Sequence, residues 1–358
     1  MMDISGMPGV DPKNSALVGV DVGGTKIAAV LMRNGGVLGS ARIPTRHGNQ
    51  AVIDDICSVV GTLTAGGPLR PVAVGVGVPG RIDYRKGIVH DAVNLGVRRL
   101  DLSAELGRRL GLPVHVENDV NAAALGEAAL AYPNLRTVAV LNAGTGLAAG
   151  VIRSGRIDHG AHGTVGEVGH VPVDPHRLPC ACGQKGCLET VASGSAVSRM
   201  WPEGGRTPMS SLLGEAESGN PRAREVLDVV LGGLTTSVLL LAMTVDPDVI
   251  VISGGMAAAG APLLSAVRDR LRARSSSSAF LDSLKLDERV ALADSQMPWG
   301  AVGAALSASV ALRDSEGNVE GPDGNVSVSA YGVGASRQEE NTVGVPDGDL
   351  AGMEAGCD

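Results

Sequence analysis

The sequence predicts an α/β protein with mixed sheets and two similar lobes, on three observations. Apolar strand-like runs alternate with helix-like runs through the first 131 residues, in the order β-β-β-α-β-α-β-α. A strand, a glycine turn with threonine and a second strand occur twice, about 120 residues apart. The 358 residues are 44% hydrophobic and 19% charged, which is typical of a globular protein that can bury a sizeable core.

The first lobe is expected over residues 16–118, and the last helix is expected to return to it with residues 299–313. Its strands are expected at five apolar runs: 16–21, 26–32, 36–43, 71–78 and 114–117. Helices are expected at 51–63 and 102–110. An alanine-rich helix begins at Asn118 and Asp119 and runs to about residue 131.

The second lobe is expected over residues 119–298 and begins on a similar plan. Two apolar strands, 137–142 and 147–152, are again joined by a glycine turn. The later elements alternate between helix and strand: helix 223–245, strand 249–253, helix 262–273, strand 290–293 and a last helix 300–312. Two such lobes would face each other across a cleft.

The formal net charge of −8 belongs to one end of the chain. From Asp314 to Asp358 ten acids stand against one base, Arg337, which makes −9 and leaves the other 313 residues near +1. This segment has no helical or strand periodicity, so we expect residues 314–358 to be a disordered acidic tail. Residues 1–15 are expected to be a flexible leader.

Composition disfavours nucleic acid and membranes as partners. Aromatic residues make up only 2% of the chain, and base-stacking surfaces are built from aromatic rings. The uncharged run 229–245 is short for a membrane span and is interpreted as a buried helix. The N-terminus has no basic and apolar signal pattern, and Cys57 and Cys357 are isolated, so a cytoplasmic protein is expected.

Two glycine turns could approach a polyphosphate. In the first, Asp21 ends a strand before Gly23, Gly24, Thr25 and Lys26, so that backbone N–H groups and a hydroxyl can meet phosphate oxygens while Asp21 holds Mg²⁺. Taken alone, this pattern favours a plain hairpin with a glycine turn. The second turn repeats it, and a strand-ending glycine pair follows later: Gly144, Thr145, Gly146, Gly254 and Gly255.

One histidine and three cysteines lie in a compact stretch. His170, Cys180, Cys182 and Cys187 offer one imidazole and three thiolates, a ligand set suited to tetrahedral structural Zn²⁺. A free thiol cluster or a local disulfide is the alternative. With four protein ligands the site would be closed, so the metal would anchor the loop over 170–187 and take no part in chemistry.

These motifs resemble those of the actin-like ATPase superfamily of sugar kinases. Within it, residues 160–189 resemble the signature of the ROK family, and the resemblance covers about residues 16–312. It implies a two-lobed actin-like ATPase (ribonuclease H-like) fold with a zinc-binding loop, and it implies ATP and Mg²⁺ as cofactors.

The resemblance also implies roles for single residues. Glu117, Asn118 and Asp119 follow a strand and open a helix, where helix capping is the simpler explanation. The family pattern implies instead that Asp119 is the general base that takes a proton from a sugar hydroxyl. It implies sugar contacts from the following residues: Gly80, Arg81, Asn94, Asn118, Asp119, Glu167, His170 and Glu189. The remaining histidines are interpreted as ordinary surface or loop residues: His47, His90, His115, His159, His162 and His176.

The resemblance predicts an ATP-dependent hexose kinase, with glucose as the first candidate sugar and a dimer or tetramer as the assembly. An amino-sugar kinase, acting on N-acetylglucosamine, N-acetylmannosamine or a related aminohexose, is the alternative, and polyphosphate is a possible donor. A sugar-responsive repressor is disfavoured, because about 20 residues before Asp21 are too few for a helix-turn-helix domain.

Overall fold

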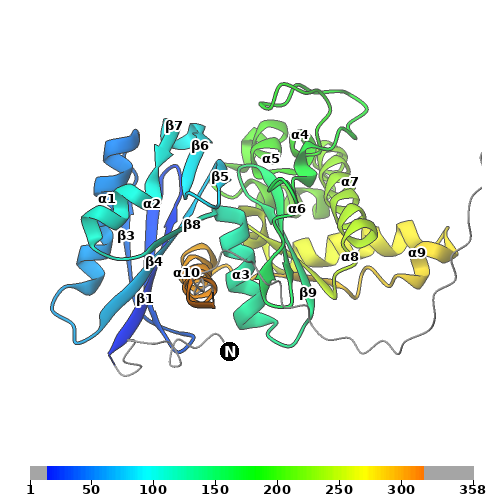
Figure 1. Cartoon of the computed structure of the whole chain (residues 1–358). Helices are drawn as coiled ribbons and strands as arrows, with labels where there is room; N and C mark the ends of the chain where they lie inside the picture. The colour runs from blue at the N-terminus through cyan, green and yellow to red at the C-terminus, as the bar shows by residue number, and fades with distance from the viewer. Residues whose placement is uncertain (1–13, 318–358) are drawn as a thin grey trace, which may run out of the picture. The chain divides into compact units, whose positions relative to one another are not determined.

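Two five-stranded sheets with the same strand order form the framework of the computed structural model, which describes residues 14–317 (Figure 1). The first has the order β3-β2-β1-β4-β8, made of β1 (Ser15–Val22), β2 (Lys26–Arg33), β3 (Gly36–Pro44), β4 (Arg70–Val78) and β8 (Val114–Asn118). The second has the order β11-β10-β9-β12-β13, made of β9 (Thr137–Ala143), β10 (Leu147–Arg153), β11 (Arg156–Ile157), β12 (Val249–Ser253) and β13 (Val290–Leu292).

The two sheets also share their strand directions. In each, the first three strands of the order are antiparallel neighbours and the last two run parallel to the middle strand. The duplication suggested by the two glycine turns is therefore a duplication of topology, and the prediction of mixed sheets flanked by helices is confirmed. In both sheets the parallel strands end at the same edge, where an open α/β sheet offers a binding site.

Helices cover both faces of the first sheet. On one face, α1 (Asn49–Thr64) and α2 (Leu102–Leu110) bury Val52, Ile56 and Leu106 against apolar strand residues. On the other face, α3 (Asp119–Ala131) and α10 (Trp299–Gly317) pack with Leu17 and Met32. Because helices pack on both faces of β1, its side chains are apolar on both sides, and the strand is buried along almost its whole length.

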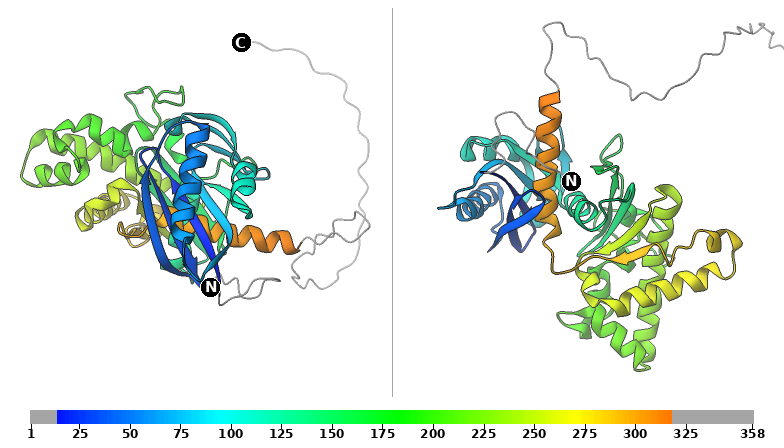
Figure 2. Two further views of the ribbon diagram at one scale, coloured as in Figure 1. Left: turned by 90° about the vertical axis from the view of Figure 1, so that its left-hand side faces the viewer. Right: turned by 90° about the horizontal axis from the view of Figure 1, so that it is seen from below.

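α3 and α10 cross between the two sheets (Figures 1 and 2). At the crossing a Cβ on Gly303 would lie 1.6 Å from the backbone oxygen of Ala122, and a Cβ on Gly126 would lie 2.6 Å from that of Trp299. Only glycine allows the helices to approach this closely. α10 continues to Gly317, past the start of the segment predicted to be a disordered tail, and residues 318–358 of that prediction lie outside the described residues.

The second sheet is covered by the long helix α7 (Pro221–Thr244) and by α8 (Ala261–Ser275). α7 is long and apolar enough to cross a membrane by composition, but 56% of its most apolar stretch is buried inside the protein. It packs Leu234, Val238 and Leu241 into the largest apolar core of the described residues. As predicted for the uncharged run there, it is a core helix.

The sequence did not predict several short elements. A small three-stranded sheet projects from the first lobe, formed by β5 (Arg81–Asp83), β6 (Ile88–Ala92) and β7 (Val97–Asp101). In the second lobe, further short helices follow the cysteine-rich loop and β12: α4 (Glu189–Ala192), α5 (Gly194–Met200), α6 (Pro208–Glu217) and α9 (Ala279–Ser283). The insertion of β5–β7 matters for the site, because Gly80 and Arg81 begin it.

Candidate functional site

Two cavities meet at the start of α3. We call the first the interlobe cavity; it has a volume of about 370 Å³, and its lining includes Asp21 and Lys26 from the first sheet, Asp119 from the start of α3, and Asn142 and Ser253 from the second sheet. We call the other the loop cavity; it has a volume of about 490 Å³, and its lining includes Gly80, Arg81, Asn118, Glu167 and His170. Asn118 and Asp119 are adjacent in sequence but face different cavities.

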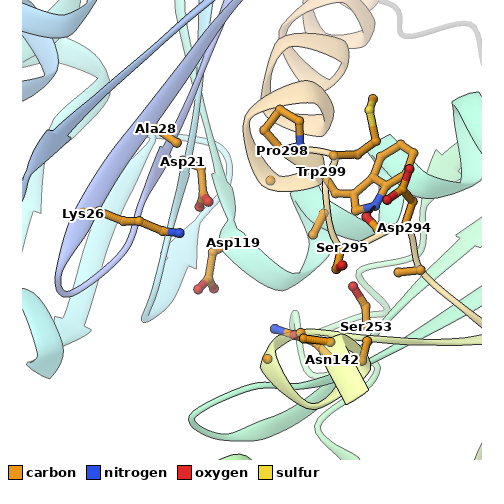
Figure 3. Close-up of a pocket in the computed structure, with 18 of the residues that line it drawn as sticks. Asp21, Lys26, Ala28, Asp119, Asn142, Ser253, Asp294, Ser295, Pro298 and Trp299 are labelled. Carbon is orange, nitrogen blue, oxygen red and sulfur yellow. Dashed lines mark hydrogen bonds between the residues drawn. The ribbon is translucent and has the colours of Figure 1, made fainter. Parts of the chain in front are cut away.

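Asp21 and Asp119 lie next to each other in the interlobe cavity, with the ammonium of Lys26 beside them (Figure 3). Burial, together with the negative charge of Asp119, raises the pKa of Asp21 to about 7. Burial raises the pKa of Asp119 to about 6. Two carboxylates that are costly to ionise together are a donor set for a hard cation such as Mg²⁺, whose charge favours the ionised forms.

Backbone geometry fixes Asp119 at the N-terminus of α3. The side chain of Asn118 caps the helix by accepting hydrogen bonds from the backbone N–H groups of Val120 (3.0 Å) and Asn121 (3.3 Å). The carboxylate of Asp119 accepts a hydrogen bond from the Val120 N–H at 3.0 Å. Capping and a chemical role are therefore compatible, because Asn118 caps the helix and Asp119 projects into the cavity.

The predicted nucleotide-binding residues divide into two groups. Asp21, Lys26, Gly254 and Gly255 line the interlobe cavity. The remaining turn residues are not among its lining residues: Gly23, Gly24, Thr25, Gly144, Thr145 and Gly146. The first turn is braced by the hydroxyl of Thr45, which donates to the Gly23 carbonyl at 2.7 Å.

The predicted sugar-binding residues also divide. Five of them line the loop cavity: Gly80, Arg81, Asn118, Glu167 and His170. Asn94 lies instead against the first glycine turn, where a Cβ on Gly24 would be 3.2 Å from its side chain. The carboxylate of Glu189 accepts a hydrogen bond from the Leu147 N–H at 3.0 Å, just after the second glycine turn. Neither Asn94 nor Glu189 lines the loop cavity in this structure.

Several lining residues were not predicted from the sequence. Tyr84, Asn121 and His162 line the loop cavity, and Arg42 and Trp299 line the interlobe cavity. Asn121 lies one helical turn after Asn118, a spacing that could have suggested it. The others come from elements distant in sequence, for which no local pattern exists.

The interpretation as ordinary surface or loop residues is wrong for His115 and His159, whereas His162 is an exposed loop residue as predicted. His162 lines the loop cavity. His115 and His159 both approach the fully buried carboxylate of Glu117, with their Nε2 atoms 3.9 Å and 2.9 Å from its Oε2. A charged strand residue with no exposure needs such partners, and this requirement was the signal available in the sequence.

The cysteine cluster has the dimensions of a zinc site. His170, Cys180, Cys182 and Cys187 bring their ligand atoms within 4.8 Å of one another. The Sγ atoms of Cys182 and Cys187 are 3.7 Å apart, and Cys180 Sγ is 3.8 Å from His170 Nδ1. Two thiolates at about 2.3 Å from a tetrahedral Zn²⁺ would be about 3.8 Å apart. All three cysteines are unpaired in this structure, which favours the metal site over a local disulfide.

A second buried carboxylate joins α3 to the second sheet. Oε1 of Glu127 accepts a hydrogen bond from the hydroxyl of Ser253 at 2.5 Å, and Ser253 lines the interlobe cavity. Oε2 of Glu127 is buried and has no hydrogen-bond partner among the described residues. Burial raises the pKa of Glu127 to about 7.

The sequence and the fold both match known proteins. The profile of the ROK family matches residues 17–309. A glucokinase of Halalkalibacterium halodurans is 33% identical over 280 residues, which cover 72% of this chain and 85% of the relative. An N-acetyl-D-glucosamine kinase of Escherichia fergusonii is 32% identical over 256 residues, which cover 66% of this chain and 83% of the relative.

Among solved structures, a ROK family glucokinase from Streptomyces griseus in complex with glucose and AMPPNP superposes with a TM-score of 0.68. It is 30% identical, and the match covers 82% of this chain and 99% of that one. The two proteins therefore share one fold over almost the whole length of the solved protein, and this is the fold expected from the sequence.

Proposed function

The chain belongs to the ROK family, and from this premise we propose that it transfers the γ-phosphoryl group of ATP to a hexose, with glucose as the first candidate. An ATP-dependent sugar kinase is the function that its glucokinase relatives support. The expected product is glucose 6-phosphate.

The observation that carries the mechanism is the place of Asp119 between the two cavities. It lines the interlobe cavity, which ATP would occupy, while its neighbours Asn118 and Val120 line the loop cavity, which the sugar would occupy. A carboxylate at this junction can reach a sugar hydroxyl that points toward the γ-phosphate. Phosphoryl transfer depends mainly on such positioning and on charge stabilisation.

Asp119 would act as the general base. It accepts the proton of the attacking hydroxyl as the oxygen approaches phosphorus, and a pKa near 6 lets it remain ionised at neutral pH while still being a useful proton acceptor. Asn118, Glu167 and His170 would hold the sugar through hydrogen bonds to ring hydroxyls, and Gly80, Arg81, Asn94 and Glu189 remain proposed sugar contacts. Lys26 would balance the negative charge of the donor phosphates.

Two metal ions would have different roles in this protein. Asp21 would hold Mg²⁺, which neutralises phosphate charge when bound. His170 and the three cysteines would hold a closed structural Zn²⁺. Nδ1 of His170 faces the thiols while the residue also lines the loop cavity, so a zinc ligand would orient a sugar-binding imidazole.

An amino-sugar kinase is the second candidate, because an N-acetyl-D-glucosamine kinase is among the similar proteins. The loop cavity, at about 490 Å³, has room for either sugar. We further propose a cytoplasmic homodimer or homotetramer that binds sugar and ATP, without nucleic acid or membrane partners.

The test is a coupled ADP-release assay of the purified protein with glucose, mannose, fructose, allose, glucosamine, N-acetylglucosamine and N-acetylmannosamine. Glucose is expected to give the highest kcat/KM. A higher value for N-acetylglucosamine would select the second candidate. Replacing ATP by inorganic polyphosphate in the same assay identifies the donor, and no sugar-dependent release from either donor would contradict the proposal.

A further inference from the structure

Glu117 is a buried acid whose role the proposed mechanism leaves open. It lies on β8, two residues before Asp119, and its side chain is fully buried. Oε1 accepts hydrogen bonds from the backbone N–H of Asn118 at 2.8 Å and from the amide of Asn121 at 3.4 Å. One carboxylate oxygen therefore holds the start of the helix that carries Asp119.

The other oxygen reaches the second lobe. Oε2 of Glu117 is 2.9 Å from Nε2 of His159, which stands 42 residues later. The imidazole of His159 also packs on the ring of Tyr84, with ring centroids 3.9 Å apart. The pair therefore connects the β8 end of the first lobe with the segment that follows β11.

That segment, residues 158–167, supplies one wall of the loop cavity; we call it the sugar loop. It contributes His162, Thr164 and Glu167 to the cavity lining. At its far end it is attached to β10 by the hydrogen bond from the Ala149 N–H to the Gly166 carbonyl, at 2.7 Å. At its near end, His159 attaches it to Glu117 and hence to the strand that leads to Asp119.

We propose that Glu117 and His159 are positioning residues for the sugar: their hydrogen bond holds the sugar loop against β8, so that Asp119 and the loop side chains contact the same sugar molecule. This inference rests on the proposed function. Neither residue needs to touch the sugar, because each acts through its neighbours, Asn118 and Asp119 on one side and the sugar loop on the other.

The charge of Glu117 makes the bond worth more than an ordinary surface contact. Burial by itself raises the pKa of Glu117, but the nearby imidazoles of His115 and His159 outweigh it and hold the pKa below its usual value. A hydrogen bond to a buried charge is among the stronger ones in proteins, so its loss is expected to lower kcat/KM for the sugar about 10- to 100-fold.

The experiment compares three variants with the wild type. His159→Ala removes the bond, and His159→Gln restores an amide N–H near the position of the imidazole Nε2–H. His115→Gln is the matched control, because His115 lies 3.9 Å from the same oxygen but belongs to β8 and does not reach the sugar loop. Steady-state kinetics with each substrate varied in turn, and hydrogen exchange of residues 158–167, are the two readouts.

His159→Ala is expected to lower kcat/KM for the sugar by the stated factor, to leave KM for ATP within about twofold, and to speed exchange in the sugar loop. His159→Gln is expected to recover most of both losses, and His115→Gln to stay within about twofold of the wild type. Any of three results would overturn the proposal. His159→Ala could change the kinetic constants for sugar and ATP equally, His159→Gln could be no more active than His159→Ala, or His115→Gln could lower kcat/KM as much as His159→Ala does.

If His159→Ala does not fold, Glu117→Gln takes its place, because it keeps the side-chain shape and removes the charge; the expected loss is again in the constant for the sugar. If the wild type phosphorylates no sugar, the proposed function fails on its own. Hydrogen exchange still decides whether His159 holds the sugar loop, since unchanged exchange in His159→Ala refutes the link without any activity.

Discussion

Asp119 lies where burial raises its pKa to about 6, at the boundary of the two cavities. In Asp119→Asn the side chain keeps its shape but has lost its ability to take a proton at neutral pH. We expect kcat to fall at least about 100-fold with sugar binding nearly intact.

The measurement is kcat from ADP release, with sugar affinity measured separately by calorimetry. Zinc content serves as the control for correct folding. Turnover close to that of the wild type would remove Asp119 from the role of base.

Glu127 makes stability depend on pH. Its pKa is about 7 in the folded protein, against 4.5 as its ordinary value, so between these two pH values the folded state holds a proton that the unfolded state has lost. The contribution of Glu127 to the free energy of unfolding is therefore complete below about pH 4.5. It is lost as the pH rises through about 7, a decrease in stability on the order of 3 kcal/mol.

The amide of Glu127→Gln has no such titration. We expect its melting temperature to exceed that of the wild type by more at pH 8 than at pH 5. Thermal unfolding of both proteins at the two pH values is the measurement. An equal difference at both pH values would show that Glu127 does not titrate in this range.

At the scale of single elements, the cysteine-rich loop joins a metal site to the loop cavity through His170. Removing one ligand in Cys182→Ser is expected to release Zn²⁺ and to raise KM for the sugar, because His170 loses the contact that orients it. Cys57→Ser, on α1, is the matched control and should keep its metal.

Metal analysis and sugar KM of the two variants test this prediction. The wild type should hold about one equivalent of zinc. Less than half an equivalent, or zinc retained in Cys182→Ser, contradicts the four-ligand site.

The longer elements could be predicted from the sequence and the shorter ones could not. β4 is a mostly apolar run followed by Pro79 and Gly80, and β12 is one followed by Gly254 and Gly255, so their bounds were predicted to within one residue. The strands β5–β7 are three to five residues long, with charged residues between buried ones, and they are stable only because they pack together and on the first lobe. Local pattern carries too little information for elements whose stability comes from contacts far away.

At the scale of the whole molecule, the crossing of α3 and α10 joins the two sheets. A methyl group at Gly303 would meet the Ala122 carbonyl at 1.6 Å, so Gly303→Ala must push the helices apart. We expect a loss of about 1–3 kcal/mol in unfolding free energy, the usual cost of overpacking. We also expect a fall in kcat, because Asp119 belongs to α3 and because α10 packs on β1, which carries Asp21.

The matched control is Gly232→Ala, inside α7, where an added Cβ would meet nothing within 4 Å. There, alanine is expected to stabilise by about 0.5–1 kcal/mol through helix propensity. Urea unfolding of both variants is the measurement. Equal effects at both positions would mean that the crossing is looser than the structure shows.

The candidate site was predictable where motifs are local. Asp21, Lys26 and Asp119 stand in short motifs beside strands, and the structure brings them into one cavity. Glu117 and His159 are 42 residues apart, and their contact depends on how the second lobe meets the first. No spacing rule covers such a pair, although an acid in an apolar strand already required a partner.

The return of α10 to the first sheet has a consequence for synthesis of the protein. The second sheet is contiguous from Thr137 to Leu292, whereas one face of the first sheet waits for residues 299–317. On the ribosome, we therefore expect the later half of the chain to complete its core before the earlier half does, with β1 and β4 exposing an apolar face until residues 299–317 have been made. In the nascent chain, the apolar face of the first sheet would therefore need to be bound by a chaperone for longer than the second sheet would.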